Sequence, residues 1–394
     1  MRGRRRSRLR EMVNIVSRPE ILSLAGGLPA PEFFPAREYA QALEHVLLSD
    51  PSALQYGPAF APLKDHIVDL MRERGVDCSA SQILLTTGAQ QGIRVLTTLL
   101  LDPGGEVLTE EITYTGLGQA VGPLRPRHLT VGTDLDSGME VDEIPALLED
   151  GARPAFIYAI PDAHNPLGVS MAPWKRERLV EVAREYRVPI IEDDPYGFLG
   201  YGGEGDGEPE KNPPPIRALD GEWVFYLGTF SKMIAPALRL GWMVLPADLV
   251  DRASIVKEAI DLECSALTQR AVAAYLDAGH LPAHLERLRG AYRIRRDAML
   301  AALERFFPKS AAWTRPRGGM FVWVELPPEV NCETLLDEAL QEERVAFVPG
   351  SAFTIAEGCA SNCMRLSFST CTPDDIEEGV RRLGKLLNRR ISNA

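Results

Sequence analysis

Between about residues 80 and 246, short apolar runs alternate with segments whose apolar residues recur at helical spacing. Several of the runs are apolar nearly throughout, as strands covered on both faces of a sheet are. The runs are Ile83–Thr87, Glu106–Glu110, His128–Val131, Ala155–Ile160, Val188–Glu192, Trp223–Leu227 and Leu240–Leu245. Helical patterns such as Trp174–Tyr186 lie between them. This alternation predicts a mainly parallel sheet, which binds ligands at the carboxyl ends of its strands.

The pattern changes after residue 246. Residues 248–307 read as long helices, and the remainder mixes strands with helices, which predicts a second, smaller α+β domain. The predicted strands are Met320–Leu326 and Met364–Ser369, and the predicted helices are Glu333–Glu343 and Asp374–Leu387. Residues 200–215 are rich in glycine, proline and acidic residues, and are predicted to form a loop too polar and kinked to pack.

Composition narrows the class of protein. The chain has 394 residues, 45% of them hydrophobic, which is enough for one large domain and a smaller one. A net charge of -12 argues against nucleic acid as a partner. No apolar run reaches the ~18 residues that a membrane span needs, so no membrane partner is expected. The arginines between Arg2 and Arg10 are interpreted as a solvated terminus.

The six cysteines and six histidines form no metal-binding or redox spacing. We therefore expect no metal site. Thiols that are buried or idle fit a reducing compartment, and the predicted location is the cytoplasm.

Lys232 differs in context from the other six lysines, which lie among charged or loop residues where solvation is expected. It follows the apolar run WVFYLGTFS and precedes MIAPALRLGW. A buried ammonium is costly unless it is paired or used, and desolvation lowers the pKa of a lysine, as a Schiff-base nucleophile requires. The alternative is a lysine whose amine reaches solvent from a buried turn.

The stretch Gly228–Lys232, followed by Pro236 and Arg239, resembles the lysine motif of class I aminotransferases of fold type I. The resemblance implies that Lys232 binds pyridoxal 5′-phosphate (PLP) as a Schiff base, with Thr229 and Arg239 on the phosphate. Ala237 replaces the glycine usual in the motif.

Two segments earlier in the chain extend the resemblance. Gly88–Gly92 follows a predicted strand and opens a helix, whose free N–H groups favour a phosphate, although a plain strand–helix connection fits equally well. The family's phosphate turn assigns Ala89 and Gln90 as cofactor binders. A lone aromatic such as Tyr114 is ordinarily a core residue, but the resemblance implies that it stacks on the cofactor ring.

Asp193 and Asp194 end the run VPIIEDD, and such a pair is commonly a cap or part of an ion pair. The family's pattern selects Asp193 for the ring nitrogen, which a carboxylate keeps protonated so that the ring accepts electrons. It assigns Tyr196 to the phenolic oxygen and leaves out Asp194. Asn165 precedes Pro166, which alone indicates only a turn, but the family's Asn-Pro motif places this amide on the phenolic oxygen and the substrate.

Other matches involve the substrate. Arg18 and Gly27 fall in segments that resemble the substrate-covering part of the aminoadipate and kynurenine aminotransferase branch. Tyr56 matches a tyrosine that reaches the PLP phosphate of the neighbouring subunit. Arg365 lies in an apolar strand and therefore needs an anion; a structural ion pair would suffice, whereas the resemblance implies a clamp on the substrate carboxylate.

The resemblance covers about residues 18–388 and predicts an α/β protein of fold type I. Its expected parts are an N-terminal arm and substrate-covering segment (1–35, part of the small domain), a large PLP-binding domain with a mainly parallel seven-stranded sheet (36–278), and a small C-terminal domain (279–394). The expected assembly is a homodimer with shared active sites.

The predicted activity moves the amino group of an α-amino acid to a 2-oxo acid, with Lys232, Asp193 and Tyr196 as catalytic residues. The main alternative is a PLP-dependent biosynthetic enzyme that decarboxylates, eliminates or oxidises, because Ile112, His164 and Leu167 depart from the family pattern. A third reading, the effector sensor of a winged-helix regulator, is disfavoured because only about 18 residues precede the family core.

Overall fold

The computed structural model describes residues 20–202, 212–355 and 359–392. Its main feature is a seven-stranded sheet in the order β2-β10-β9-β8-β7-β3-β4, in which only β10 runs antiparallel to its neighbours. The strands are β2 (Ile83–Thr86), β3 (Glu106–Glu110), β4 (Arg127–Val131), β7 (Pro154–Ala159), β8 (Ile190–Asp193), β9 (Val224–Thr229) and β10 (Gly241–Val244). All seven coincide with the runs predicted from the sequence, so the mainly parallel sheet is confirmed.

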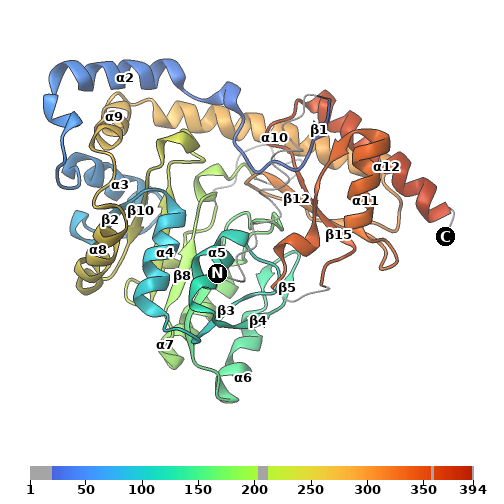
Figure 1. The fold of residues 1–394 in the computed structure, drawn as a ribbon, viewed down its shortest axis with the longest axis horizontal. Coiled ribbons are helices and arrows are strands. Elements are labelled where there is room, and N and C mark those ends of the chain that lie inside the picture. Colours follow the sequence, from blue (N-terminus) through green and yellow to red (C-terminus); the bar gives the residue numbers. More distant parts are fainter. Residues whose placement is uncertain (1–19, 203–211, 356–358, 393–394) are drawn as a thin grey trace.

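Successive residues of these strands belong to different apolar clusters, because side chains alternate between the two faces of a sheet. Val107 packs with α4 (Ala89–Leu100), α5 (Thr115–Val121) and α8 (Ala247–Asp261). Its neighbour Leu108 packs with α6 (Ile144–Glu149) and α7 (Pro173–Tyr186) on the other face. Helices thus cover both faces of the sheet (Figure 1), which explains why several of the runs are apolar nearly throughout rather than alternating.

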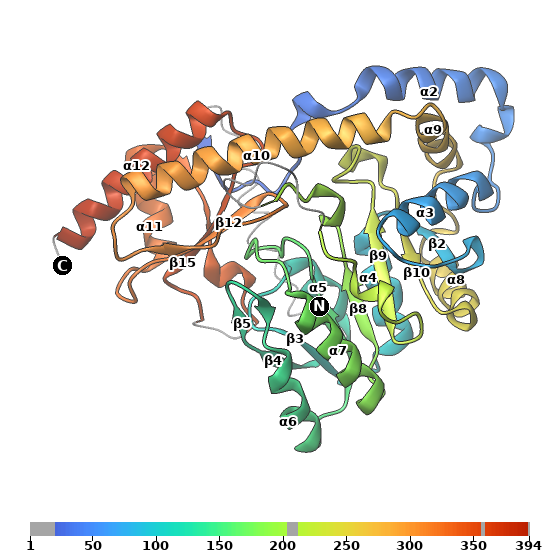
Figure 2. The same cartoon turned by 180° about the vertical axis from the view of Figure 1, so that it is seen from behind.

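A second, smaller sheet lies beside the first and has the antiparallel order β11-β12-β15-β14. Its strands are β11 (Ala312–Trp313), β12 (Phe321–Glu325), β14 (Val348–Pro349) and β15 (Cys363–Ser367). It is accompanied by α11 (Cys332–Glu338), a π-helical turn at Ala339–Glu343 and α12 (Pro373–Ser392). The long helix α10 (Leu281–Phe306) extends from the side of the large sheet to α12 and joins the two parts (Figure 2).

The first described strand forms a separate two-stranded sheet with a segment of the C-terminal part. β1 (Leu22–Ser23) pairs in parallel with β13 (Val345–Ala346), more than 300 residues away in sequence. The chain then returns through α2 (Ala36–Ser49) and α3 (Ala61–Glu73) to the large sheet, where α2 packs on α9 (Ala266–Asp277) (Figure 1). A short hairpin completes the strands, with β5 (Thr133–Asp134) paired to β6 (Gly138–Met139).

The loop predicted at 200–215 is only partly as expected. Residues 203–211 lie outside the described part, but Tyr201 and Pro215 at its two ends are buried. Asn212 donates its side-chain N–H to the carbonyl oxygen of Gly197 at 3.0 Å. The prediction that the loop does not pack was wrong for these ends, because a side-chain amide and a tyrosine ring anchor them. In the part of the chain that is described, no helix is long and apolar enough to cross a membrane.

Candidate active site

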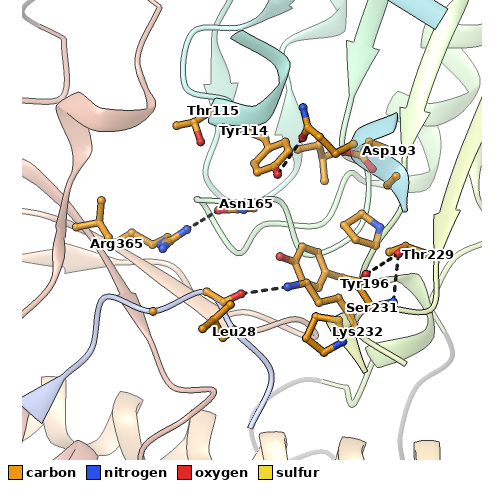
Figure 3. Close-up of a pocket in the computed structure, with 18 of the residues that line it drawn as sticks. Leu28, Tyr114, Thr115, Asn165, Asp193, Tyr196, Thr229, Ser231, Lys232 and Arg365 are labelled. Atoms are coloured by element: carbon orange, nitrogen blue, oxygen red, sulfur yellow. Dashed lines mark hydrogen bonds between the residues drawn. The ribbon is translucent and has the colours of Figure 1, made fainter. Parts of the chain in front are cut away.

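A cavity of about 860 Å³ opens where the carboxyl ends of the large-sheet strands face the small sheet and residues 23–28. Figure 3 shows its lining side chains converging from these three parts of the chain. Eleven of the residues predicted from the sequence line it together. They are Gly27, Ala89, Gln90, Tyr114, Asn165, Asp193, Tyr196, Thr229, Lys232, Arg239 and Arg365. Most lie at the carboxyl end of a large-sheet strand or within a few residues after it, which is where a parallel sheet collects its ligand-binding residues.

Lys232 follows β9 and extends into the cavity, where Nζ donates to the carbonyl oxygen of Gly27 at 3.1 Å (Figure 3). Burial, together with the nearby positive charges of Arg365 and Arg239, lowers the pKa of its amine to about 8. A neutral amine is therefore accessible near neutral pH, as a nucleophile requires.

Two other lysines are also buried, so the expectation that all six remaining lysines are solvated was wrong. Lys175 lies 3.2 Å from Glu140, and Lys257 lies 2.9 Å from Asp261. Each ammonium is stabilised by its carboxylate, which no sequence pattern around these lysines revealed. Lys232 differs from both because no acidic partner is found for it within the described residues.

Asp193 is the last residue of β8, and its two carboxylate oxygens differ in their hydrogen bonding. Oδ2 accepts from the hydroxyl of Tyr158 at 2.5 Å, whereas buried Oδ1 has no hydrogen-bond partner in the described part of the protein. The pKa of this carboxyl is raised to about 6, chiefly by burial and further by the charge of Asp194, while the hydrogen bond from Tyr158 opposes the rise. An unmatched buried acceptor that lines a cavity fits a ligand that brings an N–H donor.

Asp194 is turned away from the cavity. It accepts from the backbone N–H of Gly197 at 2.7 Å and from the Tyr226 hydroxyl at 3.0 Å, and it lies 3.3 Å from Arg74. The sequence-based choice of Asp193 rather than Asp194 for the cavity agrees with this geometry.

The end of the cavity near β2 and β9 gathers donors suited to an anion. Helix α4 starts at Ala89 after Gly88, whose φ is +84°, and Arg239 Nη2 donates to the Thr87 carbonyl at 3.1 Å. A Cβ on Gly88 would stand 2.8 Å from that Nη2, so glycine lets the guanidinium approach the helix N-terminus. The hydroxyls of Thr229 and Ser231 lie 3.0 Å apart beside them. Backbone N–H groups, hydroxyls and a guanidinium together suit a phosphate.

Tyr114, Tyr196 and Asn165 also line the cavity, and the two tyrosines lie on either side of its centre (Figure 3). The hydroxyl of Tyr114 donates to Gln90 Oε1 at 3.2 Å, and burial raises its pKa to about 12. Burial also raises the pKa of Tyr196 well above its usual range. Both phenols are therefore protonated donors at neutral pH.

Arg365 extends from β15 between two phenyl rings. Its Cζ atom lies 4.2 Å from the ring centroid of Phe321 and 4.8 Å from that of Phe353. Nη1 donates to Asn165 Oδ1 and Nη2 to the carbonyl of Ala25, each at 2.8 Å, while Nε lacks a partner among the described residues. Burial lowers its pKa to about 10. No carboxylate pairs with it in the described ranges, so the structural ion pair considered for it is not seen, and the guanidinium can accept an anion from outside.

Of the other predicted site residues, one lies elsewhere and one falls outside the described part of the chain. Tyr56 is 85% exposed and lies outside this cavity, at a smaller hollow of about 390 Å³. Arg18 lies outside the described residues. The three residues that depart from the family pattern do not line the cavity. His164 and Leu167 are buried, and Ile112 packs against the apolar cluster that contains Leu167.

Several lining residues were not predicted. Ser231 is adjacent to Lys232, and its hydroxyl beside Thr229 was a usable signal. Tyr158 does not line the cavity but supports Asp193 from near the end of β7, where its sequence context is that of an ordinary core tyrosine. Phe353 and Thr370 come from loops that only the three-dimensional structure brings to the cavity.

The site offers what PLP needs: an amine of lowered pKa for its aldehyde, a free buried carboxylate oxygen for its ring nitrogen, and a donor cluster for its phosphate. The seven-stranded sheet and this arrangement define a PLP-dependent enzyme of fold type I. In the described part of the chain, no group of three or more histidine, cysteine, aspartate or glutamate side chains is arranged to hold a metal.

The family model described as aminotransferase class I and II matches residues 21–383, and the chain belongs to this family. Curated relatives include the aromatic-amino-acid aminotransferase 1 of Thermococcus litoralis, 37% identical over 99% of this chain and 93% of the relative. Another is the 2-aminoadipate transaminase of Thermus thermophilus, 39% identical over 97% and 94% of the two chains. The solved kynurenine aminotransferase of Pyrococcus horikoshii matches with a TM-score of 0.91 and 37% identity, over 99% of this chain and 96% of the other. The protein is thus a PLP-dependent aminotransferase.

Proposed function

We propose that Lys232 is the residue that binds PLP covalently and then moves the proton of the substrate Cα. The observation that carries this assignment is the position of Nζ in the cavity, with its pKa lowered to about 8 and no acidic partner in the described chain. When bound, PLP supplies an electron sink for the charge that develops at Cα. Lys232 then acts as the general base and acid next to that carbon.

The other side chains are assigned by their place in the lining of the cavity and by their chemistry. Asp193 Oδ1 accepts the ring N–H, while Tyr196 and Asn165 donate to the phenolic oxygen. Ala89, Gln90, Thr229 and Arg239 hold the phosphate, and Tyr114 covers the ring. The free Oδ1, the protonated phenols and the donor cluster around the start of α4 support these assignments.

Arg365 is proposed to bind the α-carboxylate of the substrate. Its planar fork suits a carboxylate, and its Nε has no hydrogen-bond partner among the described residues. Asn165 holds one end of the fork, and the backbone of residues 25–27 closes the cavity above it.

The substrate is proposed to carry a large apolar side chain. Leu28, Val348 and Phe353 supply apolar walls, and within the described lining Lys232, Arg239 and Arg365 are the only cations. An acidic side chain, such as that of 2-aminoadipate, calls for a further cation, for which Arg18 is the candidate predicted from the sequence.

Transamination is favoured over a diverted reaction by the position of the departing residues. Ile112, His164 and Leu167 do not line the cavity, so they present no group to a substrate carbon. His164 Nε2 instead lies 3.1 Å from buried Glu110.

The test is incubation of the PLP-loaded enzyme with a panel of amino acids in the absence of an acceptor. Stoichiometric conversion of the cofactor to its amine form, with one 2-oxo acid released per site, is expected for leucine- or phenylalanine-like substrates. Release of carbon dioxide, loss of a side-chain group, or continued turnover without acceptor would instead establish a diverted reaction.

The active unit is proposed to be a cytoplasmic homodimer. Tyr56 and Leu54 are 85% and 72% exposed, as residues that enter a partner's site would be in one isolated chain. All six thiols are free, as in a reducing compartment.

The proposed domains are residues 36–278 and 279–394, with 1–35 belonging to the smaller one. The pairing of β1 with β13 and the ion pair of Glu32 with Arg295 on α10 support the assignment of the N-terminal segment.

A further inference from the structure

One guanidinium outside the cavity holds two loops of the active site together. Arg74, directly after α3, donates Nη2 to Asp162 Oδ2 at 2.9 Å and Nη1 to Asp194 Oδ2 at 3.3 Å. The Arg74 side chain is 10% exposed, and both carboxylates are fully buried. Asp162 lies in the loop after β7, and Asp194 begins the loop after β8.

Each carboxylate is close to groups assigned to the cofactor. Asp162 precedes Asn165 by three residues and is also 2.7 Å from Arg176. Asp194 lies between Asp193 and Tyr196, and it accepts the backbone N–H of Gly197 at 2.7 Å. A change in the distance between the two carboxylates would therefore move the amide of one loop relative to the phenol and carboxylate of the other.

The loop after β8 packs closely around the Arg74 guanidinium. A Cβ on Gly197 would stand 1.8 Å from Arg74 Nη1 and 2.3 Å from Asp194 Oδ2, so the absence of a side chain allows the close approach. The ring of Phe198 covers the guanidinium, with its centroid 5.3 Å from Cζ. Asp194, Gly197 and Phe198 thus surround Arg74, and all three belong to the loop that carries Tyr196.

We propose that Arg74 is a positioning residue for transamination: it fixes Asn165 on one loop relative to Asp193 and Tyr196 on the other, without contacting substrate or cofactor. The proposal rests on the cofactor roles proposed for those three residues. A planar fork can bond two carboxylates at once in a fixed geometry, which a flexible ammonium cannot reproduce. Because these groups must meet the reacting atoms closely, a loop shift of about 1 Å lowers turnover by about 100-fold.

The test compares R74M and R74K with the wild-type PLP-loaded enzyme, measuring kcat, KM and the circular dichroism of the cofactor band. We expect R74M to lose about 10- to 100-fold in kcat per folded site, with KM changed less than about threefold, because the Arg365 clamp is untouched. The cofactor band should change its dichroism, since its contacts are displaced. R74K keeps a charge beside the buried carboxylates and is expected to fold, yet to lose at least about fivefold in kcat.

Arg184→Met is the control. Arg184 on α7 pairs with the buried carboxylate of Asp220 at 2.6 Å, and no contact of it with either loop is found among the described residues. It should keep wild-type kcat and dichroism in fractions of equal oligomeric state.

The proposal is overturned if kcat per folded site and dichroism are unchanged in R74M, or, where R74M does not fold, in R74K. Wild-type kcat in R74K would equally overturn it, since charge alone would then suffice. An inactive wild-type enzyme would contradict the proposed function, whereas a wild-type dichroism spectrum in both variants would contradict the role of Arg74.

Discussion

The carboxylates of Asp193 and Asp194, neighbours in sequence, meet opposite environments. Oδ1 of Asp193 is buried without a hydrogen-bond partner in the described chain, whereas Asp194 is bonded to Gly197, Tyr226 and Arg74. Successive side chains at the end of a strand point to opposite sides, which separates the two groups. One carboxylate is left for a ligand, and the other belongs to the scaffold.

Asp193→Asn should retain PLP but lose at least about 100-fold in kcat, because an amide no longer stabilises the positive charge on the ring nitrogen. Steady-state kinetics and cofactor absorbance would measure both effects. Asp194→Asn should lower the unfolding temperature more and kcat less. A mild Asp193→Asn together with a severe Asp194→Asn would show that the wrong carboxylate has been assigned to the cofactor.

The rate at which the apoenzyme captures PLP should follow the titration of Lys232. Burial and two nearby arginines bring its pKa to about 8, against the usual 10.5, and only the neutral amine reacts. The capture rate should therefore rise as pH increases towards about 8 and level off above it. Stopped-flow absorbance on the apoenzyme would measure it, with Lys232→Ala as the control that forms no covalent band. A rise that continues to pH 10.5 would contradict the lowered pKa.

Arg365→Met should raise KM for amino acids by about 10- to 100-fold, the cost of losing hydrogen bonds to a charged group. PLP affinity should change little, because Arg365 lies at the opposite end of the cavity from the donor cluster around α4. Titration with PLP and a kinetic panel would separate the two effects. Parallel losses of folding, cofactor and substrate binding would indicate a structural role instead.

Mixing Lys232→Ala with Tyr56→Phe chains tests the shared active site. In a mixed dimer, the Tyr56→Phe subunit keeps Lys232 and receives Tyr56 from its partner. Random pairing should then yield sites of wild-type PLP affinity in roughly a quarter of the total, where neither parent has any. Equilibrium PLP titration of co-refolded chains measures this fraction. If no such sites appear although mixed dimers form, Tyr56 serves its own subunit.

The strands of the large sheet could be predicted from the sequence because each is an apolar run bounded by turn residues. The cavity residues that follow them were also recognisable, since a motif of fixed spacing places Thr229, Lys232 and Arg239 on one turn. Asp193 could be told from Asp194 only through the spacing to Tyr196, and the structure supplies the physical reason.

What the sequence could not predict depends on contacts between distant residues. Lys175 and Lys257 were predicted to be solvated because their carboxylate partners could not be recognised. Glu140 is distant from Lys175 in sequence, and Asp261 forms with Lys257 only one of many possible pairs four residues apart on a helix. Arg74 precedes a glycine in a charged stretch and gave no sign of its two buried carboxylates. Phe353 reaches Arg365 only because β14 and β15 are neighbours.

The contacts that residues 25 and 27 make with Arg365 and Lys232 run through main-chain carbonyl oxygens. Every amino acid carries a carbonyl, so these contacts survive replacement of the side chains in the segment. Leu28, whose side chain is 63% exposed, can therefore vary between descendants of this gene without disturbing the reacting groups, whereas Ala25 is constrained by its buried position. Single substitutions there can accordingly change the substrate preference while the catalytic residues keep their positions.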